Sequence, residues 1–115
     1  LAPESRVDLV GRAELLTVAA CLERAALFVG NDSGLMHLAA ASGAPTLGLF
    51  GPSREELYAP WGAHCASVRA EQSFDEIITR PDYDYRRQDS HMQGLSVDKV
   101  AVAAETLWRR RSAAA

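Results

Sequence analysis

A group of polar residues lies between residues 30 and 37, in the stretch GNDSGLMH. Apolar residues on both sides place this group between a predicted strand and a predicted helix. The first backbone N–H groups of a helix lack internal partners and can bind a diphosphate. Gly34 allows a phosphate to approach the backbone closely, and the Ser33 hydroxyl is a further donor. An ordinary capped helix start uses the same residue types, so both interpretations stay open.

Asp32 and His37 suit other parts of a phosphorylated sugar. A carboxylate repels a diphosphate, so we expect Asp32 to accept hydrogen bonds from sugar hydroxyls or to cap the helix. His37 can donate to a phosphate or a hydroxyl, or it can simply pack beside a neighbouring loop.

A second polar group follows the next predicted strand, in the stretch FGPSREELYAPWG. We expect Gly51, Pro52 and Ser53 to form a loop beside the first group, because parallel strands end at the same edge of a sheet. Ser53 can cap a short helix. Tyr58 and Trp61 are expected to pack in the core or at a hinge.

Several familiar site motifs are absent. The sequence contains neither the G-x-x-x-x-G-K-[ST] loop nor the G-x-G-x-x-G fingerprint, and the residues around Ser33 do not form a nucleophile elbow. The only D-x-D match is 82–84, within a polar loop. Four potential ligands there show no repeated metal-ligand spacing, so we expect no metal site: Asp82, Asp84, Asp89 and His91.

The positions of these groups depend on alternating helices and strands. The patterns predict helices at about 12–24, 33–42 and 96–111, strands at 25–30, 44–51 and 64–70, a short helix starting at Ser53, a helix or turn at 73–79 and a loop at 80–94. This alternation is typical of a Rossmann-like α/β fold with a mostly parallel sheet and right-handed crossovers. Since only about three strands are visible, further strands or a partner are expected to complete the sheet.

Apolar stripes indicate which helix faces are buried. The first helix has Leu15, Val18, Leu22 and Ala25 at helical spacing, and the last has Val97, Val100, Ala104, Leu107 and Trp108. Ser96 is expected to cap the last helix, with Asp98 in its first turn.

Composition excludes some classes of function. The 115 residues are 48% hydrophobic and 23% charged with a net charge of −3, which gives no general attraction to nucleic acid. Cys21 and Cys65 are predicted to be buried free thiols in a reducing cytoplasm. The sequence has no apolar run near 18 residues, and it starts with Leu1, so we expect a piece of a longer protein.

Residues 8–62 resemble the ADP-heptose:lipopolysaccharide heptosyltransferases, glycosyltransferase family nine. The combination of DSGLMH, SGAPT and FGPS carries the resemblance, and LSVDKVAVAAETL resembles the closing helix of that family. The resemblance implies a GT-B fold in which residues 1–115 form a single domain, a truncated C-terminal domain that holds the nucleotide sugar.

The resemblance also implies roles for individual residues. Backbone N–H groups of Ser33, Gly34 and Leu35 would bind the donor diphosphate, and Asp32 would contact the transferred sugar. His37 belongs to the same motif. The nucleoside side would involve three residues, of which the last two replace the Lys-Thr often seen in the family: Gly11, Arg12 and Ala13.

The implied reaction is inverting transfer of heptose from ADP-heptose to a lipopolysaccharide core acceptor, without a metal or cofactor. The catalytic base would lie in the absent N-terminal domain, so this chain would hold no catalytic residue and would be inactive alone. The full-length enzyme would be cytoplasmic, with peripheral association with the inner membrane. Two alternatives stay open: a GT-B transferase with another nucleotide sugar, and a non-catalytic nucleotide-binding or interaction domain.

Overall fold

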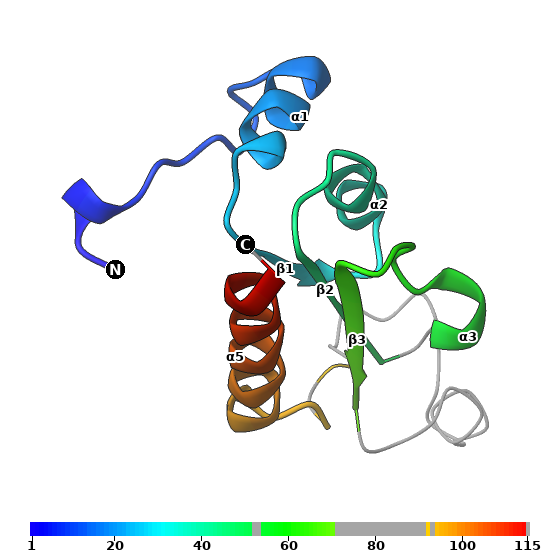
Figure 1. Ribbon diagram of the computed structural model, residues 1–115. Helices are drawn as coiled ribbons and strands as arrows, with labels where there is room; N and C mark the ends of the chain where they lie inside the picture. The colour runs from blue at the N-terminus through cyan, green and yellow to red at the C-terminus, as the bar shows by residue number, and fades with distance from the viewer. Residues whose placement is uncertain (52–53, 71–91, 93, 115) are drawn as a thin grey trace, which may run out of the picture.

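The computed structural model describes residues 1–51, 54–70, 92 and 94–114 (Figure 1). In chain order the elements are η1 (Pro3–Ser5), α1 (Leu15–Glu23), β1 (Phe28–Asn31), α2 (Gly34–Ala41), β2 (Thr46–Phe50), α3 (Glu55–Tyr58), β3 (Cys65–Arg69) and α5 (Val97–Ala114). The predicted helix or turn at 73–79 and nearly all of the predicted loop at 80–94 lie outside the described residues.

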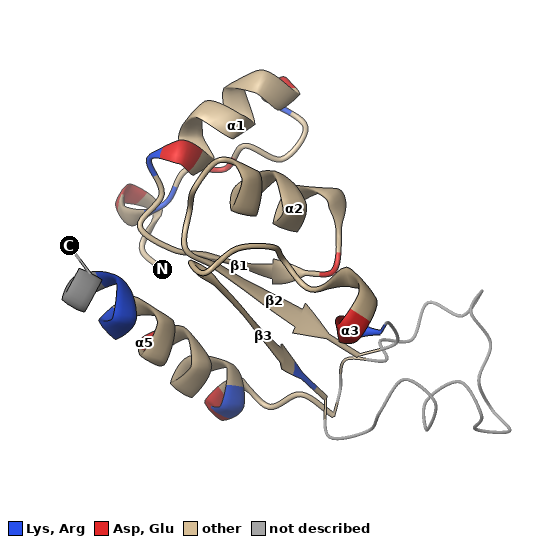
Figure 2. Ribbon diagram, turned by 45° about the vertical axis from the view of Figure 1, so that its right-hand side comes forward, with Lys and Arg blue, Asp and Glu red and all other residues tan. Residues whose placement is uncertain are grey.

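The three strands form one parallel sheet in the order β1-β2-β3. Helix α2 packs on β1 and β2, whereas α5 packs on β2 and β3. Figures 1 and 2 show these two helices on opposite faces of the sheet, with α1 outside α2. This arrangement confirms the predicted α/β class with a parallel sheet and flanking helices.

The core lies on both faces of the central strand. Leu47 of β2, Val68 of β3 and Leu107 of α5 form a buried cluster on one face. On the other face, Met36 of α2 is fully buried. A Cβ placed on Gly48 would come within 2.6 Å of the Met36 sulfur and 2.9 Å of the Phe50 ring, so glycine leaves the space that this packing uses.

Helix α1 is shorter and less buried than the apolar stripe predicts. A turn with positive φ at Gly11 precedes it, and Glu14 at its N-cap is extended, so the helix begins at Leu15 rather than near residue 12. Among the described elements α1 packs mainly on α2, and Leu15 is 65% exposed. Cys21 is also exposed, so the prediction of a buried thiol at this position was wrong.

The first predicted strand is less buried than its continuous apolar run indicates. β1 spans Phe28–Asn31 and is an edge strand of the described sheet, with Val29 42% exposed. β2, by contrast, pairs on both sides and lies between two helix layers, which buries almost all of its residues. A continuous apolar run therefore identified both strands, but it did not show which one lies at an edge of the sheet and which one is central.

The second cysteine is closer to expectation. Cys65, the first residue of β3, is partly buried and not in a disulfide. Burial raises the pKa of its thiol, and hydrogen bonding with Thr46 partly opposes this shift. The neutral thiol is thereby favoured at this position.

Helix α5 begins as predicted. The Ser96 hydroxyl accepts a hydrogen bond from the Lys99 backbone N–H at 3.1 Å, which is an N-cap contact. Val100 and Ala104 pack on the core cluster, and Leu107 is buried within it. The helix continues to Ala114, beyond the predicted end near 111.

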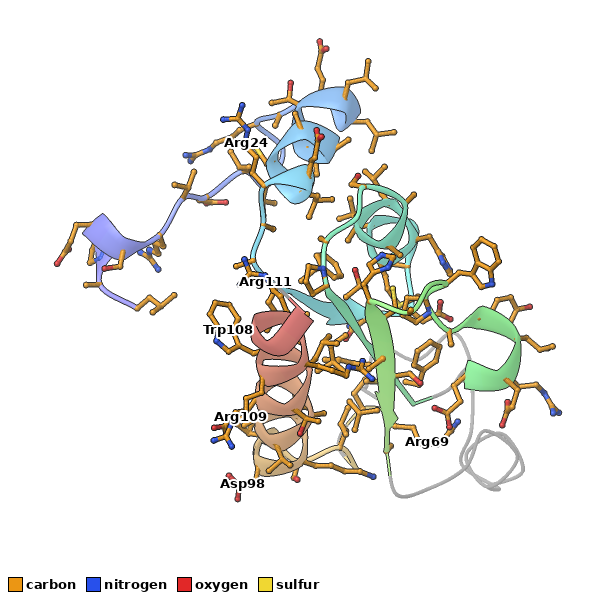
Figure 3. The ribbon with its side chains drawn as sticks, in the orientation of Figure 1. Arg24, Arg69, Asp98, Trp108, Arg109 and Arg111 are labelled. Atoms are coloured by element: carbon orange, nitrogen blue, oxygen red, sulfur yellow. The ribbon has the colours of Figure 1, made fainter. Side chains whose placement is uncertain are left out.

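Two members of the predicted α5 stripe are not buried. Val97 is 83% exposed, because it is the first residue of the helix and precedes the turns that pack on the sheet. Trp108 is 43% exposed, and the Arg111 guanidinium lies 5.2 Å from its ring centroid, a cation–π distance (Figure 3). Trp108 directly follows Leu107, and the rotation between consecutive helical residues points its side chain away from the sheet.

We predict that Gly48→Ala lowers the free energy of unfolding by about 1–3 kcal/mol, because the added methyl group must displace Met36 or Phe50. Urea denaturation followed by circular dichroism measures the change. Gly34→Ala is the matched control, since a Cβ there meets no described atom within 4 Å. Equal stability of the two variants would contradict the packing described here.

Candidate functional site

The carboxyl ends of the three strands meet at one edge of the sheet. Asn31 at the end of β1 pairs with Leu49, and Phe50 at the end of β2 pairs with Arg69. The Asp32 N–H then donates to the Leu49 carbonyl at 3.3 Å, which extends the ladder by one residue. Charged segments follow β1, begin α3 and end β3 along this edge (Figure 2). The two polar groups of the sequence therefore lie side by side.

Ser33 turns the chain from β1 into α2. It is extended, with φ −162° and ψ 168°, and its Oγ accepts a hydrogen bond from the Met36 N–H at 3.4 Å. Ser33 is therefore the N-cap, and the Asp32 carboxylate is not used for this role. Gly34 and Leu35 follow as the first residues of α2, where backbone N–H groups have no intrahelical acceptor.

The start of α2 is open to a ligand. Gly34 is exposed, and no described atom outside its own neighbourhood lies within 4 Å of the place its Cβ would take. Leu35 is 48% exposed. The unpaired N–H groups and the helix dipole together give this surface a positive potential, which suits an anion.

Asp32 and His37 face each other across the first turn of α2. The His37 Nε2 lies 4.0 Å from the Asp32 Oδ1, and the side chains are 49% and 24% exposed. About half of the His37 side chain is therefore exposed, and whether it packs beside a loop or contacts a ligand stays a prediction. Both side chains can reach a ligand seated on the helix start.

A shallow groove of about 620 Å³ joins this helix start to α1. It is lined by Leu15 of α1 and by Ser33, Gly34, Leu35, His37, Leu38 and Ala41. Gly11, Arg12 and Ala13, the predicted nucleoside side, lie just before Glu14, the N-cap of α1. They are not among the residues that line the groove, to which α1 contributes Leu15.

The second polar group is described in part. Gly51 is buried at the end of β2, whereas Pro52 and Ser53 lie outside the described residues. Helix α3 begins at Glu55 with Arg54 at its N-cap and no side-chain cap bond. The Arg69 guanidinium donates to the Gly51 carbonyl at 3.1 Å and lies 3.6 Å from the Glu55 carboxylate.

Sequence reasoning missed Arg69 and Glu55, which belong to this edge through contacts across the sheet. The alternation of β3, which puts Ser67 and Arg69 on one face, was the available signal. Tyr58 and Trp61 were expected to pack in the core or at a hinge. They are 51% and 90% exposed, and α3 is a single turn with no buried residue, so core packing was wrong and a place at a hinge stays a prediction.

No group of three or more His, Cys, Asp or Glu side chains suitable for a metal occurs among the described residues. The four loop residues weighed as metal ligands, Asp82, Asp84, Asp89 and His91, lie outside that part of the chain. Within the described helices, none is both long and apolar enough to span a bilayer.

We predict that Ser33→Ala lowers the free energy of unfolding by about 0.5–2 kcal/mol through loss of the N-cap bond. Asp32→Ala should cost less, because its carboxylate does not cap α2. Thermal or urea melts of the two variants measure the difference. A larger loss in Asp32→Ala would show that the carboxylate has mainly a structural role.

Three comparisons identify relatives of this chain. Residues 1–81 match the model of glycosyltransferase family 9, described as heptosyltransferase. Two curated proteins named lipopolysaccharide heptosyltransferase 3, from Escherichia coli strain K12 and from Escherichia coli, are each 28% identical over 99 residues. These matches cover 86% of this chain and 28% of each relative.

The crystal structure of a family 9 glycosyl transferase from Veillonella parvula DSM 2008 shares the fold, with a TM-score of 0.70 and 32% sequence identity over 87% of this chain. The chain spans only 28% of the length of these relatives. The family match includes the whole of the site just described, from Gly11 to Arg69. The chain belongs to glycosyltransferase family 9, the heptosyltransferase family.

Proposed function

We propose that this chain is the donor-binding part of a glycosyltransferase that moves heptose from ADP-heptose to a lipopolysaccharide core acceptor. One observation carries the proposal: an open, capped helix start and a carboxylate that does not cap it lie together at the carboxyl edge of a parallel sheet, in a chain of family 9. This edge is where α/β sheets bind their ligands.

The diphosphate would lie on the start of α2. Backbone N–H groups of Ser33, Gly34 and Leu35 are the proposed donors, and Gly34 leaves room for the phosphate. These groups would also stabilise the charge on the departing ADP without a metal or cofactor, because they are fixed before reaction. The Ser33 hydroxyl contributes by holding the helix start in place.

Asp32 would bind hydroxyl groups of the transferred sugar, since a carboxylate is repelled by the diphosphate itself. His37, 4.0 Å from Asp32, would orient that carboxylate or donate to the ligand. The adenosine would extend along the groove toward Leu15, near Gly11, Arg12 and Ala13. Gly51, Pro52 and Ser53 would border the same cleft.

The rest of the enzyme is part of the proposal. The chain would be a truncated C-terminal domain of a GT-B protein, with α5 as its closing helix. The N-terminal domain would supply the catalytic base and the acceptor site for inverting transfer. The enzyme would work in the cytoplasm, at the inner face of the inner membrane.

We predict that Gly34→Ala weakens ADP binding about tenfold while leaving stability nearly unchanged, because a methyl group enters the space proposed for the phosphate. Isothermal titration calorimetry on the full-length protein that carries this sequence measures the effect. Glu56→Ala, at an exposed site on α3, is the control and should bind ADP normally. Unchanged ADP affinity in Gly34→Ala would show that the phosphate does not bind at this helix start.

Donor specificity tests the function itself. We expect the full-length protein to release ADP from ADP-heptose in the presence of a lipopolysaccharide core acceptor, and Asp32→Ala to lose most of that activity. Asp98→Ala is the matched control, because it removes an exposed carboxylate from the first turn of α5. Release of the nucleotide from a different nucleotide sugar would mean that the donor substrate is not ADP-heptose. No nucleotide release from any donor would favour a non-catalytic binding domain.

A further inference from the structure

Arg69 joins the end of β2 to the start of α3. One guanidinium nitrogen donates to the Gly51 carbonyl at 3.1 Å, and another lies 3.6 Å from Oε1 of Glu55. Gly51 and Glu55 stand on either side of the connection between β2 and α3. A single planar side chain therefore fixes both ends of that connection.

Glu55 is held by β3 from a second point. The Ser67 hydroxyl donates to Oε2 of Glu55 at 3.2 Å, so both carboxylate oxygens contact β3. Ser67 and Arg69 are two residues apart and lie on one face of the strand. The ion pair is partly shielded from water, with the Arg69 and Glu55 side chains 19% and 28% exposed. Shielding strengthens such a pair relative to one at the open surface.

The backbone of Arg69 is fixed as well. The next residue, Ala70, donates its N–H to the Phe50 carbonyl at 2.8 Å. The Lys99 ammonium of α5 donates to the Arg69 carbonyl at 2.8 Å. Arg69 thus stands where β2, β3, α3 and α5 meet, and its guanidinium cannot move without disturbing the end of β2.

The end of β2 supports the proposed donor site. Leu49 accepts the hydrogen bond from the Asp32 N–H, and Gly51 follows two residues later. The position of Asp32, and with it the start of α2, therefore depends on how β2 ends. Because Glu55 offsets the charge of Arg69, the guanidinium suits this holding role better than direct phosphate binding.

We infer that Arg69, together with Glu55, is a positioning residue for donor binding: it holds the end of β2 so that Asp32 and the start of α2 keep the geometry that the nucleotide sugar requires. This inference rests on the proposed function, and it adds a part of the site outside the sequence motifs.

Kinetics of the full-length enzyme test this role. In Arg69→Met we expect the ADP Kd and the donor KM to rise about tenfold, the size expected for the loss of a charge-assisted hydrogen bond, with kcat little changed. Arg69→Lys should recover part of the affinity, because an ammonium can reach Gly51 or Glu55 but not both. A purely structural role would lower the melting temperature and leave the KM unchanged.

A double-mutant cycle and a control complete the test. Arg69→Met and Glu55→Gln should have effects on the ADP Kd that do not add, because both remove the same contact. Arg109→Met is the control. It breaks the exposed ion pair of α5 in which the Arg109 guanidinium lies 2.6 Å from the Glu105 carboxylate, and it should change neither the ADP Kd nor the donor KM.

The outcomes separate this inference from the proposed function. A wild-type enzyme that binds ADP, with an Arg69→Met variant that binds it equally well, overturns the positioning role alone. Fully additive effects in the cycle, or no recovery in Arg69→Lys, also overturn it. A wild-type enzyme that binds no nucleotide diphosphate and uses no donor overturns the proposed function, and this inference with it.

Discussion

Parallel pairing of three strands is the constraint on which the rest of this structure depends. Parallel strands bring all their carboxyl ends to one edge, so segments far apart in the sequence come together there. The hydrogen bond from the Asp32 N–H to the Leu49 carbonyl carries this pairing one residue past β1. Without that register, the start of α2, the buried Gly51 and the end of β3 would be three unrelated turns.

The two faces of the sheet are covered by different helices. On one face α5 supplies Leu107 to the apolar cluster, and its Lys99 reaches the end of β3. On the other face α2 buries Met36 but leaves its first turn open. Burial of apolar surface stabilises both faces, and on the second the first turn of α2 also keeps backbone donors available, at the cost of leaving them without internal partners. Helix α2 therefore contributes to stability through Met36 and to the open surface through its first turn.

Local sequence patterns were sufficient for the class of fold and for the local structure around the predicted site. The continuous apolar run of β2, the polar turn after β1 and the capped start of α5 each depend on neighbours within a few residues. The patterns failed where long-range packing decides. Cys21 is exposed because nothing covers the outer side of α1 within the described residues, and Trp61 is exposed because α3 is too short to bury it.

Arg69 was missed by the sequence patterns for the same reason, because its contacts are also long-range. Its partners lie 18 and 14 positions earlier in the chain, and only the strand order β2-β3 brings them within reach. A helix start binds a diphosphate well only if it is fixed in advance, because ordering it at the moment of binding would consume part of the affinity. In the proposed site, the motif residues of α2 would therefore supply the contacts to the diphosphate, while residues outside any motif, on β3 and α3, would supply the rigidity. A search for motifs alone finds the first kind and misses the second.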